Sequence, residues 1–389
     1  MQPLTVLLTN FELRIRGGSQ LYVRDVALGL LRRGHTPVVY STSLGDVARE
    51  LRDATVPVVN DLAKVTAVPD IIHGQHNHEL FTALLRFPGV PAVRICHGWL
   101  DEPPQPFPRV LRYVAVDDTT RDRCVYEWGV PEDRLEVLLN FVDLEKFIPR
   151  GPLPNRPARA LVLSNNAQDH LWAVASACAT VGIAVEAMGH DSGNATASPE
   201  RVLGRYDIVF AKGRAALEAM ASGAAVILCD RAGVGPMVTA AELPRLRRLN
   251  FGIRTLQEAV APEPLKREIA RYDPSDAQEV TQQIRATADA GGAIELLIAL
   301  YRKVIAEHRE GGPDDGAEEL RAASAYLQQL GPRLRWADEP RAAVYPLLRS
   351  IYSRARTIPG VAAVARSPWI QRLVLTTRAR WRARASGSS

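Results

Sequence analysis

The sequence predicts an α/β protein with two doubly wound parallel-sheet domains and a helical, basic C-terminal extension. Its 389 residues exceed what one hydrophobic core usually serves, so about two domains are expected. Short apolar runs alternate with helical patterns through both halves, as in parallel sheets covered by helices. A composition of 47% hydrophobic and 23% charged residues excludes a disordered or fibrous chain.

The first domain is predicted to span residues 1–150. Its first strand, Thr5–Leu8, leads through a glycine turn into a helix over Leu21–Leu31, whose apolar residues keep helical spacing. Later strands are expected at residues 37–40, 70–73, 92–96, 113–116 and 134–139. In open parallel sheets ligands gather where the strands end, so the polar residues at these ends are the candidates for a site.

The second domain is predicted to span residues 151–310. Proline, glycine and arginine crowd residues 149–157, which indicates a linker before it. Its strands are expected at residues 160–163, 184–188, 208–210 and 225–228. A helix over Glu295–Ala306 closes the domain and is ended by the break at Gly311–Pro313.

The remaining residues, 311–389, form the predicted extension, with one more helix over residues 318–330. The net charge of the chain is +5, yet no acidic residue follows Glu339, while ten arginines lie between Arg341 and Arg384. With Trp369 and Trp381 among them, segment 341–384 is predicted to bind an anionic membrane surface. A solvated extension is the alternative. No nucleic-acid partner is expected, because no recognition fold accompanies the basic run.

Cysteine and histidine usage indicates neither a disulfide framework nor a metal site. The four cysteines, Cys96, Cys124, Cys178 and Cys229, have no paired spacing. His73, His76 and His78 lack carboxylates or cysteines at ligand spacing. Without a basic leader or about 18 consecutive apolar residues, the chain is expected to be cytoplasmic, and peripheral at the inner face of the plasma membrane if its tail binds lipid.

The turn after the first strand is the first candidate binding site. Gly17 and Gly18 stand just before the predicted helix, where backbone amides and the helix N-terminus favour an anion. Arg14 and Arg16 are candidates for added phosphate contacts. A helix entry that merely needs glycine flexibility is an equal alternative. His97 follows the strand over residues 92–96 and is predicted to face the same edge as a catalytic residue, where it would bind a substrate hydroxyl or polarise the reacting centre. A solvated loop histidine is the alternative.

The turn before a predicted helix in the second domain is the second candidate. Gly213 opens this helix, and Lys212 and Arg214 flank its positive N-terminus, which predicts a diphosphate cradle. Glu218 lies about one turn inside, where it is predicted to accept hydrogen bonds from ribose hydroxyls or, alternatively, to lie on the surface. Gly233 and Gly235 are predicted to precede a helical run. They form a third candidate cradle, for an oxygen-rich ligand, or an ordinary turn.

Taken in order, these motifs resemble the family 4 retaining glycosyltransferases of GT-B fold, over Thr5 to about Ala306. The matching segments are Gly17-Gly18, Arg33-Gly34-His35, Pro69-Asp70-Ile71-Ile72-His73, Cys96-His97-Gly98, Asn140-Phe141-Val142-Asp143 and the helix from Gly213 to Gly223. The resemblance implies two facing Rossmann-like domains with a deep interdomain cleft. It also implies that Glu218 binds the nucleotide ribose, the Gly17-Gly18 loop phosphate and His97 the donor sugar.

The resemblance further implies the reaction and its partners. Family members transfer sugar from UDP-, GDP- or similar donors, usually without a metal and with retention at the anomeric carbon. No cofactor beyond the nucleotide-sugar co-substrate is therefore expected. The acceptor is predicted to be a glycan or a lipid-linked molecule in cell-envelope polysaccharide assembly.

Two departures from the family pattern concern the sugar and the diphosphate. Phe210 stands where the family usually has a glutamate that contacts the donor sugar, and Ser164-Asn165-Asn166 stands where it commonly has arginine and lysine. Lys212 and Arg214 are predicted to substitute as catalytic cations. The alternatives are a catalytically weak or inactive GT-B protein that binds a nucleotide sugar or scaffolds an assembly, and a GT-B epimerase.

Overall fold

The structure is a computed structural model that describes residues 2–98, 102–196, 198–312 and 315–332. The chain divides into two compact units, residues 1–314 and residues 315–389. In the second unit a helix spans residues 316–332, a range that includes the predicted helix at 318–330. The arginine-rich segment 341–384 lies outside the described residues. No helix in the described part of the chain is long and apolar enough to cross a membrane.

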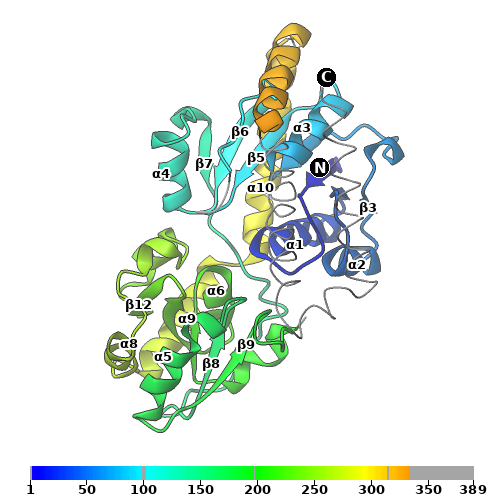
Figure 1. Ribbon diagram of the computed structural model, residues 1–389. Coiled ribbons are helices and arrows are strands. Elements are labelled where there is room, and N and C mark those ends of the chain that lie inside the picture. The colour runs from blue at the N-terminus through cyan, green and yellow to red at the C-terminus, as the bar shows by residue number, and fades with distance from the viewer. Residues whose placement is uncertain (1, 99–101, 197, 313–314, 333–389) are drawn as a thin grey trace, which may run out of the picture. The chain divides into compact units, whose positions relative to one another are not determined.

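The first domain is built on a seven-stranded sheet in the order β3-β2-β1-β4-β5-β6-β7. In Figure 1 the labels β3 and β7 mark opposite sides of this domain. Its strands are β1 (Thr5–Thr9), β2 (Thr36–Tyr40), β3 (Val58–Val59), β4 (Ile71–Gly74), β5 (Ala92–Cys96), β6 (Val110–Ala115) and β7 (Leu135–Val137). All neighbouring pairs are parallel. The carboxyl ends of the strands therefore share one edge. The last strand is shorter than predicted.

Helices connect these parallel strands. They are α1 (Gly18–Arg32), α2 (Asp46–Asp53), α3 (Asn77–Arg86) and α4 (Asp118–Tyr126). At the start of α4 the Asp117 side chain accepts a hydrogen bond from the Thr120 amide at 2.6 Å, which satisfies one of the unpaired donors of the first turn. The strand-helix alternation predicted for this half is confirmed.

The second domain has a five-stranded sheet in the order β12-β11-β10-β8-β9. Its strands are β8 (Arg159–Leu163), β9 (Ala184–Met188), β10 (Ile208–Ala211), β11 (Ala225–Asp230) and β12 (Gly233–Met237), and its helices are α5 (Gln168–Ala179), α6 (Gly213–Ala221), α7 (Leu243–Arg248), α8 (Pro262–Ile269) and α9 (Pro274–Thr287). All pairs are parallel except β11 with β12. Residues 149–157, the predicted linker, carry no helix or strand.

The long helix α10 (Ala290–Glu310) packs on the first domain, although its residues fall in the range predicted for the second. Its Ile294 and Leu297 belong to the same buried cluster as Val6 and Leu30. The contact with α1 is close, because a Cβ atom on Gly29 would lie 2.6 Å from Cγ1 of Ile294. The chain thus returns to the first domain after it has completed the second sheet.

Candidate functional site

The carboxyl edge of the first sheet brings three polar side chains together. Asn10 follows β1, Gln75 follows β4 and His97 follows β5. The Gln75 side-chain oxygen accepts a hydrogen bond from Asn10 Nδ2 at 3.1 Å and lies 3.0 Å from His97 Nε2. Because this oxygen is an acceptor, the neutral His97 ring carries its proton on Nε2. The structure therefore places His97 at the predicted sheet edge.

The surroundings of His97 keep its ring uncharged. Tyr22 of α1 packs edge-on against it with ring centroids 5.1 Å apart. Burial, reinforced by the Arg94 guanidinium, lowers the pKa of His97 to about 3. A neutral imidazole can donate or accept a hydrogen bond, so this side chain suits a hydroxyl group better than an anion.

The other two histidines considered for a metal do not join His97 in a ligand cluster. His73 is fully buried, and its Nδ1 lies 2.6 Å from the Tyr301 hydroxyl of α10. His76 packs against Phe11 with ring centroids 4.5 Å apart. Among the residues described, no group of three or more His, Cys, Asp or Glu side chains is placed to hold a metal ion.

The turn into α1 holds the first predicted pair of glycines. Gly17 is the N-cap residue, and the helix start has no side-chain cap. A Cβ atom on Gly17 would lie 2.3 Å from Gln20 Oε1, whereas one on Gly18 would meet nothing within 4 Å. Arg16, which was predicted to contact phosphate, forms an ion pair with Glu50 of α2. Open space beside the helix N-terminus thus lies at Gly18, whereas the Gln20 side chain fills the space beside Gly17, and the nearest arginine is already paired.

The turn into α6 is built differently. Gly213 has φ +57, a left-handed conformation that favours glycine, and its amide donates to the Phe251 carbonyl at 2.9 Å. That amide is therefore engaged within the protein. The amides of Arg214 and Ala215 lie in the first turn of α6, where a helix offers no intrahelical acceptor, so they are the better candidates for an anion.

Both cations predicted to bind diphosphate are paired with carboxylates. Lys212 Nζ lies 3.2 Å from Oδ1 of the buried Asp230, and its own side chain is 40% exposed. Arg214 donates through Nε to Glu218 Oε1 at 2.7 Å and through Nη2 to Asp25 Oδ2 of α1. The two cations therefore differ in exposure and in the number of their partners.

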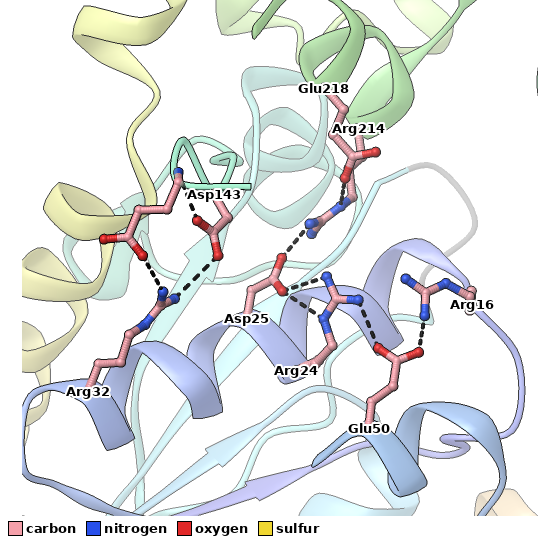
Figure 2. Close-up of polar contacts among 9 residues, drawn as sticks. Arg16, Arg24, Asp25, Arg32, Glu50, Asp143, Arg214 and Glu218 are labelled. Atoms are coloured by element: carbon pink, nitrogen blue, oxygen red, sulfur yellow. Dashed lines mark hydrogen bonds and ion pairs between the residues drawn. The ribbon is translucent and has the colours of Figure 1, made fainter. Parts of the chain in front are cut away.

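Arg214 belongs to a row of alternating charges shown in Figure 2, which we call the ionic chain. It consists of Arg16, Glu50, Arg24, Asp25, Arg214 and Glu218. Arg24 lies 2.7 Å from Asp25 through Nη2 and 3.1 Å from Glu50 through Nη1. Three positive and three negative groups alternate along it, so the charges compensate one another.

Glu218 lies about one turn inside α6, as predicted, and is buried instead of lying on the surface. Burial raises the pKa of its carboxyl group, and Arg214 opposes this rise. The paired Glu218 carboxylate keeps acceptor capacity for hydroxyl groups besides its bond to Arg214. Its role toward a ribose stays a prediction.

The third predicted cradle requires a correction. Gly233 and Gly235 do not precede a helical run, because they lie in β12, which pairs antiparallel with β11. A Cβ atom on Gly235 would lie 2.5 Å from the Thr255 carbonyl oxygen, and one on Gly233 would lie 2.8 Å from that of Glu258. Close backbone packing thus accounts for both glycines. Their role toward a donor is still untested.

The residues at the two departures from the family pattern have structural roles here. Phe210 of β10 is fully buried in a core cluster of the second domain, so its ring contributes to packing. After β8, Ser164 Oγ accepts a hydrogen bond from the Asn166 amide at 3.1 Å, which shapes the turn into α5. Neither segment contributes a charged side chain to the α6 turn.

Sequence reasoning missed Gln75, Arg24, Asp25 and Glu50. For Arg24 and Asp25 a signal was present, because an adjacent pair of opposite charge stands between the apolar residues Val23 and Val26 in the middle of a predicted helix. Both charged side chains are buried. Charges at positions where a helix buries its surface indicate partners elsewhere in the fold.

The two sheets with their helices make a GT-B fold, and comparisons with known proteins agree. A glycosyltransferase from Rickettsia africae is 15% identical, with a TM-score of 0.55, over 78% of this chain and 99% of that one. Anabaena HepE in complex with UDP and glucose is 14% identical, with a TM-score of 0.57, over 77% of this chain and 100% of that one. At such identities the likeness establishes the fold alone.

At the level of sequence, residues 16–146 match the model of Glycosyltransferase Family 4. This match lies within the first domain and includes the Gly17-Gly18 turn and His97. Among curated proteins, none matches the sequence. The matched residues do not include the second domain. The assignment of that domain, with Glu218, therefore depends on its fold and on its own geometry.

Proposed function

We propose that this protein is a glycosyltransferase that moves a sugar from a nucleotide-diphosphate-sugar donor to an acceptor hydroxyl. The observation that carries the proposal is the buried Glu218, one turn inside a helix that begins where β10 of a GT-B protein ends. The family resemblance assigns the nucleotide ribose to this glutamate, and the N-terminus of such a helix is suited to bind phosphates. The match of residues 16–146 to Glycosyltransferase Family 4 also supports the proposal that this protein is a glycosyltransferase.

In the proposed reaction, the bond between the anomeric carbon and the diphosphate oxygen breaks as the acceptor oxygen bonds to that carbon. The acceptor proton passes to the leaving phosphate. Because negative charge grows on the diphosphate, Lys212, Arg214 and the first-turn amides of α6 stabilise the transition state. The neutral His97 orients a sugar hydroxyl. Retention at the anomeric carbon and independence of metal are part of the proposal.

The donor is proposed to be linked to UDP or GDP. The Anabaena structure contains UDP and glucose, which makes UDP-glucose the first donor to test. The acceptor is proposed to be a glycan or a lipid-linked molecule of cell-envelope polysaccharide assembly. The protein would then act in the cytoplasm, peripherally at the inner face of the plasma membrane, with segment 341–384 on the anionic lipid surface.

The sharpest test replaces Glu218 by glutamine and asks whether the nucleotide ribose is still recognised. Wild-type protein should bind UDP about 10–100-fold more tightly than 2′,3′-dideoxy-UDP, as expected for charge-assisted hydrogen bonds to ribose. E218Q should lose most of this preference in calorimetric titrations. The matched control is E279Q, at the exposed Glu279 of α9, which should keep it. A preference that persists in E218Q would contradict the proposed role.

A second candidate, a GT-B protein that binds nucleotide sugars without transfer, is favoured by the buried Phe210 in place of a sugar-contacting carboxylate. Turnover with a panel of UDP- and GDP-sugars separates the two candidates. Release of nucleotide that depends on an acceptor supports transfer. Binding of every donor without turnover would favour the second candidate, and conversion of the donor sugar with its nucleotide still attached would point to an epimerase.

A further inference from the structure

The distinctive feature of the α6 turn is that its largely buried arginine, Arg214, is shared with the other domain. Arg214 bonds both to Glu218 in its own helix and to Asp25 in α1 (Figure 2). Its side chain is 14% exposed, and that of Asp25 is 4% exposed. Water therefore screens this ion pair little, and an anion that needs Arg214 must contend with Asp25.

Asp25 is built to remain ionised. Burial raises the pKa of its carboxyl group, but Arg214 and Arg24 together outweigh burial and hold the pKa below its ordinary value. The two cations use different oxygens, since Arg24 contacts Oδ1 at 2.7 Å and Arg214 contacts Oδ2. Loss of Arg214 would thus leave Asp25 paired with Arg24.

Arg214 can likewise change one partner and keep the other. Its bond to Glu218 uses Nε, whereas its bond to Asp25 uses Nη2. Exchange of Asp25 for a phosphate oxygen would leave the bond to Glu218 in place. No buried charge would be left without a partner, which is the condition for an exchange of low cost.

We propose that Asp25 competes with the donor diphosphate for Arg214, so that nucleotide binding exchanges an arginine–carboxylate pair for an arginine–phosphate pair. This inference rests on the proposed function and concerns the regulation of the same site. Its consequence is a lowered affinity for diphosphate in both donor and nucleotide product, which favours product release. The exchange also removes one ion pair between α1 and α6, which belong to different domains.

The test measures binding of inorganic pyrophosphate, UDP and uridine to the full chain by calorimetry. In D25N, pyrophosphate and UDP should bind at least about fivefold more tightly than in wild-type protein, because Arg214 has lost its competing carboxylate. Uridine, which has no phosphate, should bind equally. The matched control is D143N, since Asp143 is another buried carboxylate that pairs with an α1 arginine, Arg32 at 3.4 Å, away from Arg214.

A second variant separates competition from net charge and guards against misfolding of D25N. The double variant R24M/D25N removes one positive and one negative group, so the ionic chain keeps its net charge, and Glu50 keeps its pair with Arg16. It should show the same gain for pyrophosphate. A gain in D25N alone would mean that only net charge matters, and that result would overturn the proposal. If D25N does not fold, the double variant decides.

The remaining outcomes distinguish this inference from the proposed function. Wild-type protein that binds UDP, with no gain for pyrophosphate or UDP in either variant, overturns the competition and leaves the proposed function standing. Absence of any binding of UDP or pyrophosphate to wild-type protein and variants would overturn both.

Discussion

The carboxyl edge of the first sheet and the α6 turn of the second domain differ in how they hold their polar groups. The first edge presents Asn10, Gln75 and His97 linked by neutral hydrogen bonds. The α6 turn presents Lys212 and Arg214, each ion-paired with carboxylates. The difference teaches that neutral hydrogen-bonding groups and paired charges have separate places in this fold, and that the two cations proposed to bind the diphosphate are already compensated by the protein's own acids.

The largest expected effect comes from removing the shared cation. Arg214→Met would leave the Glu218 carboxylate buried without its arginine and Asp25 with Arg24 alone. Breaking a buried pair on one side costs about 3–5 kcal/mol of unfolding free energy. The control is Arg49→Met of α2, whose side chain is 71% exposed and pairs with the similarly exposed Asp46, and whose loss should cost under about 1 kcal/mol. Urea unfolding measures both, and equal losses would show that burial of Arg214 does not matter.

The second expected effect is a pH dependence of the unfolding free energy. It comes from His73 of β4, a buried neutral histidine in the first sheet. Burial lowers the pKa of His73 to about 3, whereas an unfolded histidine titrates near about 6.5. Between these values the unfolded chain binds a proton that the folded chain does not. The contribution of His73 to the unfolding free energy should therefore fall with decreasing pH, by about 1.4 kcal/mol per pH unit well below 6.5, and should be absent above it.

This dependence is measured by urea unfolding at pH 7.5 and pH 5.0. His73→Asn should reduce the loss of stability between the two conditions by about 2 kcal/mol, whatever its effect at neutral pH. The exposed His78 of α3 provides the control, and His78→Asn should keep the wild-type loss. An unchanged loss in His73→Asn would mean that the buried ring accepts a proton in the folded protein.

The strands of both sheets could be predicted because their signal is local. A run such as residues 225–228 is apolar throughout, and it becomes β11, buried on both faces. The positions of His97 and Glu218 followed from the same signal, since they depend on where a strand ends or a helix begins. The family resemblance then supplied the roles expected of them.

Contacts between distant segments could not be predicted. Gly233 and Gly235 look like a turn before a helix, yet their conformation depends on the backbone of residues 255–258, which packs against them. Arg214 looks like a free cation at a helix start, yet its partner Asp25 lies 189 residues away in sequence. Periodicity and spacing carry no information about such pairs, whereas an unexplained buried charge does.

The smallest expected effect separates the glycines of the two turns, which look alike in sequence. Gly213 has φ +57, and a Cβ atom there would lie 4.0 Å from the nearest atom, the Asn250 carbonyl oxygen. Space is thus available, and Gly213→Ala should cost about 1–2 kcal/mol through its left-handed backbone alone. Gly18→Ala meets nothing within 4 Å and should be neutral or stabilising by up to about 1 kcal/mol, because alanine restricts the unfolded chain.

Urea unfolding of Gly213→Ala and Gly18→Ala measures how much unfolding free energy each substitution costs. UDP titration of the same proteins shows whether either turn contacts the donor. If Gly18→Ala binds UDP as wild-type protein does, the open space beside Gly18 does not hold phosphate, and the α6 turn is the remaining cradle. If it weakens UDP at unchanged stability, the first turn approaches the donor closely. A Gly213→Ala variant as stable as wild-type protein would contradict the view that its glycine is required by backbone conformation.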